Sequence, residues 1–206
     1  MADALKKDIA LKFLMPMVVA YVGGATAIGM CLPFSIETLP IHAAAAAGIT
    51  GLIGLVLEEI YPRPLKEVLV FWRRTERVPG FRAFSQIGRK DTRVEQAKLS
   101  RLLPKGQMSP SAQNSLWYKW LKEVEDNPGI AQNHRTSLIL RDATALAATL
   151  AVLTPILGLV AFQSLVPVIV LQVSCLGVYL ALMFAARHAA ERLVGNVIAL
   201  KVAKTK

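Results

Sequence analysis

The sequence has 206 residues, of which 54% are hydrophobic and only 18% charged, and its formal net charge is +10 at pH 7. A soluble domain usually carries about 25% charged residues, so this composition argues against an ordinary soluble globular protein. The charges are also unevenly distributed, because long windows contain no Lys, Arg, Asp or Glu and the remainder is dense in them. Lipid is therefore the expected solvent for part of the chain.

Four segments are apolar over the roughly 20 residues that a helix needs to cross a bilayer. They are residues 13–34, 38–57, 143–162 and 166–186. The last two lie in one stretch without formal charge, between Asp142 and Arg187. Gln163 and Ser164, followed by Pro167, indicate a tight turn that divides this stretch into two crossings. The sequence therefore predicts four membrane-spanning helices.

Small residues recur at helical spacing in every predicted span, and the second span shows this most clearly. Ala43, Ala47, Gly51 and Gly54 share one face of the helix. Helices in lipid associate where small side chains let their backbones approach, so this face is predicted to pack against another helix. Packing within one four-helix bundle is the simplest interpretation. A subunit interface of a homo-oligomer and the wall of a pore are the alternatives.

The central segment from residue 62 to residue 142 is predicted to be helical and basic. Pro62 and Pro64 end the second span, and residues 65–74 mix apolar side chains with cations, as an interfacial helix would. Trp72 would then lie at the level of the lipid headgroups. A buried helix of a soluble domain is the alternative. The residues predicted to bind anionic lipid or a partner are Lys66, Trp72, Arg73, Arg74, Arg77, Arg82, Arg89 and Lys90.

Further helices are predicted along the rest of the segment. One runs from Asp91 to Leu103, and the next begins at Ser109 and ends before residues 126–129. From Ile130 a helix continues into the third span. The tail from Arg187 continues the fourth span and has an apolar side.

The orientation follows from where the 24 Lys and Arg residues lie. The N-terminus holds three, residues 61–142 hold sixteen, the tail holds five, and the other two connections hold none. All of them fall on one side, which the positive-inside rule assigns to the cytoplasm. Both termini and the central segment are therefore predicted to be cytoplasmic. A nucleic-acid-binding surface would produce the same excess of cations, but the membrane rule accounts for it without a second partner.

The predicted fold class is an all-α membrane protein, a four-transmembrane-helix bundle with a basic helical insert between spans 2 and 3. The predicted division is a first hairpin (1–61), a cytoplasmic segment (62–142), a second hairpin (143–186) and a cytoplasmic amphipathic tail (187–206).

Motifs for catalysis are absent from the sequence. It contains no phosphate-binding Gly-x-x-x-x-Gly-Lys loop, no Cys-x-x-Cys pair, no His-x-x-x-His and no Gly-x-Ser-x-Gly. No cofactor or metal is expected.

The leading hypothesis is a non-enzymatic membrane scaffold or sensor that oligomerises and recruits a cytoplasmic protein through its basic insert. A pore-forming or channel protein is the alternative, and a membrane enzyme comes third.

Three short segments resemble parts of small bacterial membrane proteins with no assigned activity: residues 79–85 (PGFRAFS), residues 113–118 (QNSLWY) and Arg141-Asp142. The order of parts, two spans, a cytoplasmic insert and two more spans, also resembles the membrane subunits of bacterial anti-phage systems such as Kiwa. The resemblance implies location in a bacterial inner membrane. It further implies a membrane sensor or effector that works with a cytoplasmic partner, in antiviral defence.

Overall fold

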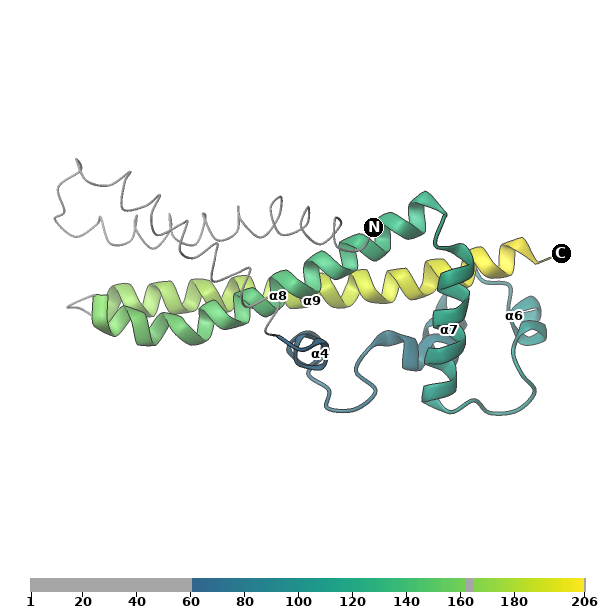
Figure 1. The fold of residues 1–206 in the computed structure, drawn as a ribbon, viewed down its shortest axis with the longest axis horizontal. Coiled ribbons are helices and arrows are strands. Elements are labelled where there is room, and N and C mark those ends of the chain that lie inside the picture. The colour runs from purple at the N-terminus through teal and green to yellow at the C-terminus, as the bar shows by residue number, and fades with distance from the viewer. Residues whose placement is uncertain (1–60, 162–164, 206) are drawn as a thin grey trace. The chain divides into compact units, whose positions relative to one another are not determined.

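The computed structural model describes residues 61–161 and 165–205, and every regular element among them is helical (Figure 1). No strand occurs in these two ranges, which agrees with the predicted all-α class. The predicted first two spans, and with them Ala43, Ala47, Gly51 and Gly54, lie outside the described residues. The elements are α4 (Arg63–Phe71), the 3-10 helix η3 (Pro79–Arg82), the π-helix η4 (Ala83–Ile87), α5 (Gly88–Lys90), α6 (Gln96–Leu102), α7 (Pro110–Val124), α8 (Pro128–Ala161) and α9 (Leu165–Lys204).

Two of these helices are long and apolar enough to cross a membrane. The qualifying stretches are Pro128–Ile156 in α8, with a mean hydropathy of 1.4, and Val168–Lys204 in α9, with a mean hydropathy of 2.3. This result rests on the length and the hydropathy of the helices alone, and the core helix of a soluble protein passes the same test. The sequence predicted that one helix runs from Ile130 into the third apolar segment and that the tail from Arg187 continues the fourth. Both predictions are confirmed, because α8 and α9 are each one uninterrupted helix.

The chain divides into two compact units, which are described separately. Unit 1 contains residues 61–66 and the described part of Asp142–Leu182. Unit 2 contains Glu67–Arg141 and Met183–Lys206. Both α8 and α9 contribute residues to each unit.

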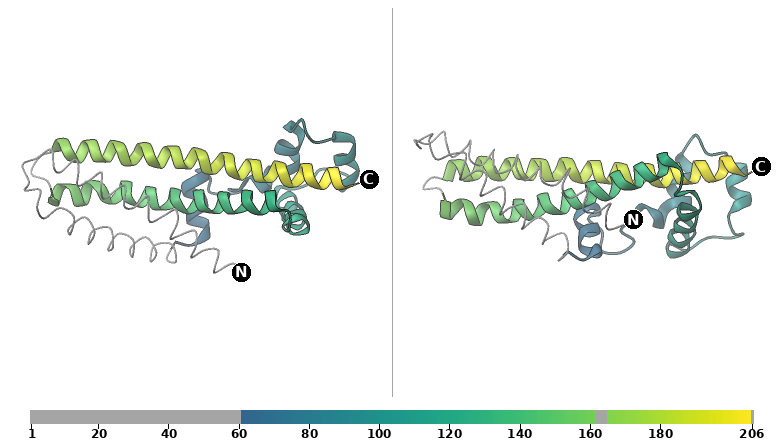
Figure 2. Two further views of the ribbon diagram at one scale, coloured as in Figure 1. Left: turned by 90° about the horizontal axis from the view of Figure 1, so that it is seen from above. Right: turned by 45° about the horizontal axis from the view of Figure 1, so that its top comes forward.

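Within unit 1, α8 and α9 lie side by side in all the views (Figures 1 and 2). Ala151 packs in a small buried cluster with Leu171 and Cys175 of α9. The hydroxyl of Thr154 donates to the carbonyl of Leu150 at 2.6 Å. This bond to the same helix satisfies the hydroxyl without water, so it is compatible with an apolar surrounding.

In the described part of unit 1, α8 and α9 expose large apolar side chains. Val152 is 66% exposed on α8, and Val166 and Val173 of α9 are exposed to a similar degree. The others of this kind on α9 are Leu165, Ile169, Val170, Leu176, Val178 and Leu180. A soluble monomer rarely exposes so continuous an apolar surface, which suits contact with lipid.

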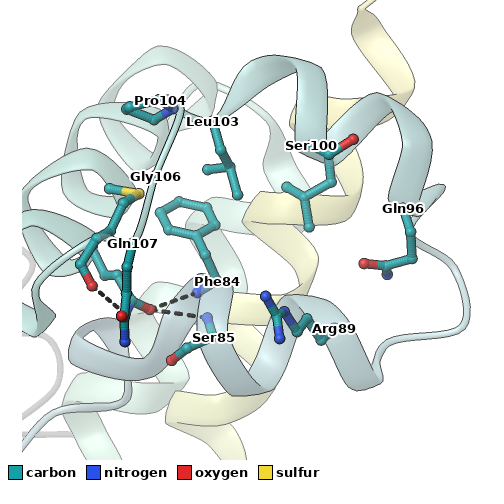
Figure 3. Close-up of a pocket in the computed structure, with 12 residues that line it drawn as sticks. Phe84, Ser85, Arg89, Gln96, Ser100, Leu103, Pro104, Gly106 and Gln107 are labelled. Atoms are coloured by element: carbon teal, nitrogen blue, oxygen red, sulfur yellow. Dashed lines mark hydrogen bonds between the residues drawn. The ribbon is translucent and has the colours of Figure 1, made fainter.

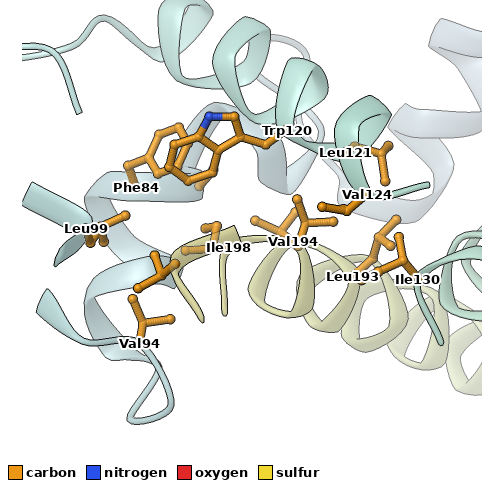
Figure 4. Packing of buried hydrophobic residues seen from close by; sticks show 13 residues of the cluster. Phe84, Val94, Leu99, Trp120, Leu121, Val124, Ile130, Leu193, Val194 and Ile198 are labelled. Atoms are coloured by element: carbon orange, nitrogen blue, oxygen red, sulfur yellow. The ribbon is translucent and has the colours of Figure 1, made fainter. Parts of the chain in front are cut away.

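Unit 2 has a hydrophobic core of its own, built from both ends of its sequence. Phe84 of η4 meets Trp120 of α7 edge to face, with ring centroids 4.9 Å apart (Figure 4). Val197 and Ile198, near the end of α9, are completely buried in the same cluster. The C-terminal part of α9 is therefore an integral element of this unit and buries the apolar side that the sequence predicted.

Capping residues explain where the helices of unit 2 begin. The Ser109 hydroxyl accepts a hydrogen bond from the backbone N–H of Ala112 at 3.2 Å, and Pro110 occupies the first turn of α7. At the start of α8, the side chain of Asn127 accepts from the N–H groups of Gly129 and Ile130. The start of α7 is where the sequence predicted it, whereas α8 begins at Pro128, two residues before the predicted start at Ile130.

The predicted helix from Asp91 to Leu103 is too long at its beginning, since α6 starts at Gln96. Asp91 accepts hydrogen bonds from the backbone N–H and the guanidinium of Arg93, at 3.0 and 2.7 Å. The bond from the Arg93 side chain lowers the pKa of the Asp91 carboxyl below its ordinary value. These local bonds stabilise a turn in place of the first helical turn.

Candidate membrane-surface site

The end of α4 projects a tryptophan into solvent. Trp72 follows the last residue of α4 and has a φ of 52°, in the left-handed region that commonly terminates a helix. Its N–H donates to the carbonyl of Val68 at 2.8 Å. The left-handed backbone turns the chain away from the helix axis, and the Trp72 side chain is 61% exposed.

Arg187 of α9 lies against this turn. Its Nε donates to the backbone carbonyl of Val70 at 2.6 Å, which satisfies one of the last carbonyls of α4. Its guanidinium carbon is 5.2 Å from the centre of the Trp72 ring and 5.8 Å from that of Phe184. Both distances are within the range of cation–π attraction. We call Val70, Trp72, Phe184 and Arg187 the Arg187 site.

More cations follow directly after the tryptophan. Arg73 and Arg74 are both exposed. Burial, and after it the positive charge of Arg73, lowers the pKa of the Arg82 guanidinium below its ordinary value. The negative charges of Glu191 and Glu76 oppose this lowering. Glu76 accepts a hydrogen bond from Arg82 through its backbone carbonyl, at 3.4 Å.

The other residues predicted for this site differ in their burial and in their ion-pair partners. Arg77 forms an ion pair with Glu67 at 4.0 Å. Arg89 and Lys90 are exposed on α5. Lys66 differs from all of them, because it is buried and forms an ion pair with Asp142 at 3.3 Å. It therefore does not belong to the exposed set of cations with which the sequence grouped it.

Arg187 was not among the residues that the sequence predicted for this site. The signal that could have found it is its position, since it is the first charged residue after the apolar stretch that begins at Ala143. A cation at such a boundary marks the level at which a spanning helix meets the headgroups. Its contact with Trp72 depends on the tertiary structure and has no counterpart in the local sequence.

The arrangement is suited to holding an anion beside an apolar surface. Unit 2 contains 19 Lys and Arg residues against 8 Asp and Glu. Guanidinium groups bind phosphate oxygens in a bidentate manner, and an amphipathic indole ring favours the boundary between headgroups and acyl chains. Within the part of the chain that the structure describes, no three His, Cys, Asp or Glu side chains are grouped so that they could hold a metal ion.

Comparison of the chain with protein-family models, with curated proteins and with solved structures finds no match.

Proposed function

We propose that this protein is a non-enzymatic scaffold or sensor subunit of the bacterial inner membrane. It crosses the membrane four times, with both termini in the cytoplasm. Unit 2 contacts the anionic surface of the cytoplasmic leaflet and recruits a cytoplasmic protein.

The Arg187 site is the observation that supports this proposal most directly. The preceding part of α9 is apolar and exposes large aliphatic side chains, and Arg187 is its first charge. The site therefore lies where the helix would leave the hydrocarbon. Trp72 and Arg187, with Arg73 and Arg74 beside them, combine the indole and guanidinium groups that a phospholipid headgroup attracts.

The compact core of unit 2 supports the recruiting role. A helical unit with its own buried cluster presents a defined surface, which an unstructured basic loop could not. Lys90 and Arg101 are exposed outside the Arg187 site, on α5 and α6. These residues remain available to an acidic surface of a partner protein while Arg187 is engaged with lipid.

Reporter fusions test the proposed topology. A reporter active only in the periplasm should be silent when it is inserted after Gly106, in the exposed loop between α6 and α7, or fused after Lys206. The same reporter fused near Ser35 should be active, because the positive-inside rule places that connection outside the cytoplasm. A reporter active only in the cytoplasm should show the reverse pattern. Periplasmic activity after Gly106 would overturn the proposed orientation.

Lipid retention tests the Arg187 site together with Arg73 and Arg74, which follow Trp72 in the sequence. Each cation near an anionic leaflet contributes about 1 kcal/mol, so replacing Arg73, Arg74 and Arg187 with Gln should weaken phosphatidylglycerol binding by about 100-fold. Native mass spectrometry of the purified full chain, titrated with phosphatidylglycerol or phosphatidylcholine, measures this change. Raising the salt concentration should weaken the binding of the unaltered protein.

The matched control replaces Arg101, Lys105 and Lys119 with Gln. These cations are exposed elsewhere in unit 2, and the change in net charge is the same. Retention of phosphatidylglycerol should fall far less in this variant. An equal loss in both triple variants would mean that net charge, and not the Arg187 site, determines lipid binding.

A further inference from the structure

Unit 2 contains a cavity of about 550 Å³ that is separate from the Arg187 site. It lies between η4, α6, the loop after α6 and the start of α7 (Figure 3). Its volume falls within the roughly 300–1,000 Å³ of small-molecule sites. Phe84, Leu99, Leu103 and Met108 form its apolar part, and Arg89 and Gln113 are among its polar groups.

One wall of the cavity is the π-helix η4, and a buried side chain holds it in place. The Gln113 side chain accepts hydrogen bonds from the backbone N–H groups of Phe84 and Ser85, at 3.1 and 3.0 Å. Gln113 is itself 5% exposed. Short π-helical segments are rare and frequently occur at functional sites. Phe84 also packs against the Trp120 ring, so contacts within the protein hold both the backbone and a side chain of this wall.

The polar part of the cavity is positively charged. None of the described residues that line it is Asp or Glu. Arg89 is exposed and forms no ion pair among the described residues, so its guanidinium is free to bind an anion. A guanidinium holds a carboxylate or phosphate through two parallel hydrogen bonds. Apolar side chains beside such a group would take the body of the same molecule.

We propose that this cavity binds a small organic anion. Its carboxylate or phosphate group pairs with Arg89, and its apolar body packs against Phe84, Leu99 and Met108. Binding here goes beyond the proposed lipid contact, because the ligand is a soluble molecule and the residues are different. A membrane-bound recruiting unit with such a site would respond to the concentration of a metabolite.

The Met108 methyl group reports occupancy of the cavity. The full-length protein, labelled with ¹³C at its methionine methyl groups and purified in a non-ionic detergent, is titrated with phenyl phosphate, benzoate and the uncharged benzyl alcohol. The Met108 signal is assigned through Met108→Leu. We expect a saturable shift with an anionic probe and a much weaker one with benzyl alcohol. A larger affinity for phenyl phosphate indicates a phosphate monoester, and a larger affinity for benzoate indicates a carboxylate.

Two adjacent cations provide the matched comparison. Arg89→Gln should raise the Kd of the anionic probe at least tenfold, whereas Lys90→Gln, which changes an exposed residue outside the lining, should leave it within twofold. The proposal is overturned if neither anion produces a saturable shift, or if Arg89→Gln and Lys90→Gln weaken binding equally.

Discussion

Replacing Lys66 with Met is expected to lower the free energy of unfolding by about 3–5 kcal/mol, the usual cost of removing one partner of a buried ion pair. Lys66 and Asp142 lie 3.3 Å apart, and their side chains are only 8% and 9% exposed. The variant keeps the volume of the side chain but removes the Lys66 ammonium group from the buried Asp142 carboxylate. Detergent-solubilised protein, unfolded by sodium dodecyl sulfate and followed by circular dichroism, provides the measurement.

The double variant separates loss of the charge pair from loss of packing. Lys66→Met combined with Asp142→Leu removes both charges, and well-packed apolar replacements of a buried pair are often neutral or stabilising. Most of the stability should therefore return. Lys90→Met, at an exposed position, should change the free energy of unfolding by less than about 0.5 kcal/mol. A small effect of Lys66→Met, equal to that of Lys90→Met, would show that water reaches the pair in solution.

The burial of Lys66 shows what the local sequence could not reveal. Its neighbours mix apolar and basic residues, which is the pattern of an interfacial helix with exposed cations. Asp142, its partner, is far away in the sequence, so the pair exists only in the folded chain. The contact between Arg187 and Trp72 escaped prediction for the same reason. Pairings of this kind depend on tertiary structure, whereas propensity and composition describe neighbours along the chain.

Local signals located several elements well. Ser109-Pro110 predicted the start of α7, where the Ser109 hydroxyl caps the helix. The same arrangement at Asn127-Pro128 was interpreted only as the end of the preceding helix, so α8 begins two residues before the predicted Ile130. Asp91 provided the same kind of signal and was misleading, because its carboxylate binds Arg93 instead of capping a helix. The π-helix Ala83–Ile87 had no signal, since the hydrogen bonds that hold its start come from Gln113 on another helix. The cavity that depends on it could not be predicted either.

Replacing Trp120 with Ala should lower the free energy of unfolding far more than replacing Trp72 with Ala. Trp120 is 4% exposed and packs against Phe84 in the core of unit 2, so Trp120→Ala should cost about 3–5 kcal/mol of stability. Trp72 is mostly exposed, so Trp72→Ala should cost less than about 0.5 kcal/mol. Unfolding of the detergent-solubilised variants by sodium dodecyl sulfate, followed by circular dichroism, measures this difference.

Trp72→Ala, which should hardly change stability, is expected to weaken lipid binding more than a change at the buried Trp120. Trp72→Ala removes the ring beneath the Arg187 guanidinium and the indole at the headgroup level, which we expect to weaken phosphatidylglycerol retention about fivefold, or roughly 1 kcal/mol. Trp120→Phe retains an aromatic ring in the core, so it should restore part of the lost stability and bind lipid normally. If Trp72→Ala binds phosphatidylglycerol like the unaltered protein, Trp72 does not contact lipid. The exposed indole at the end of α4 would then remain a surface for the cytoplasmic partner.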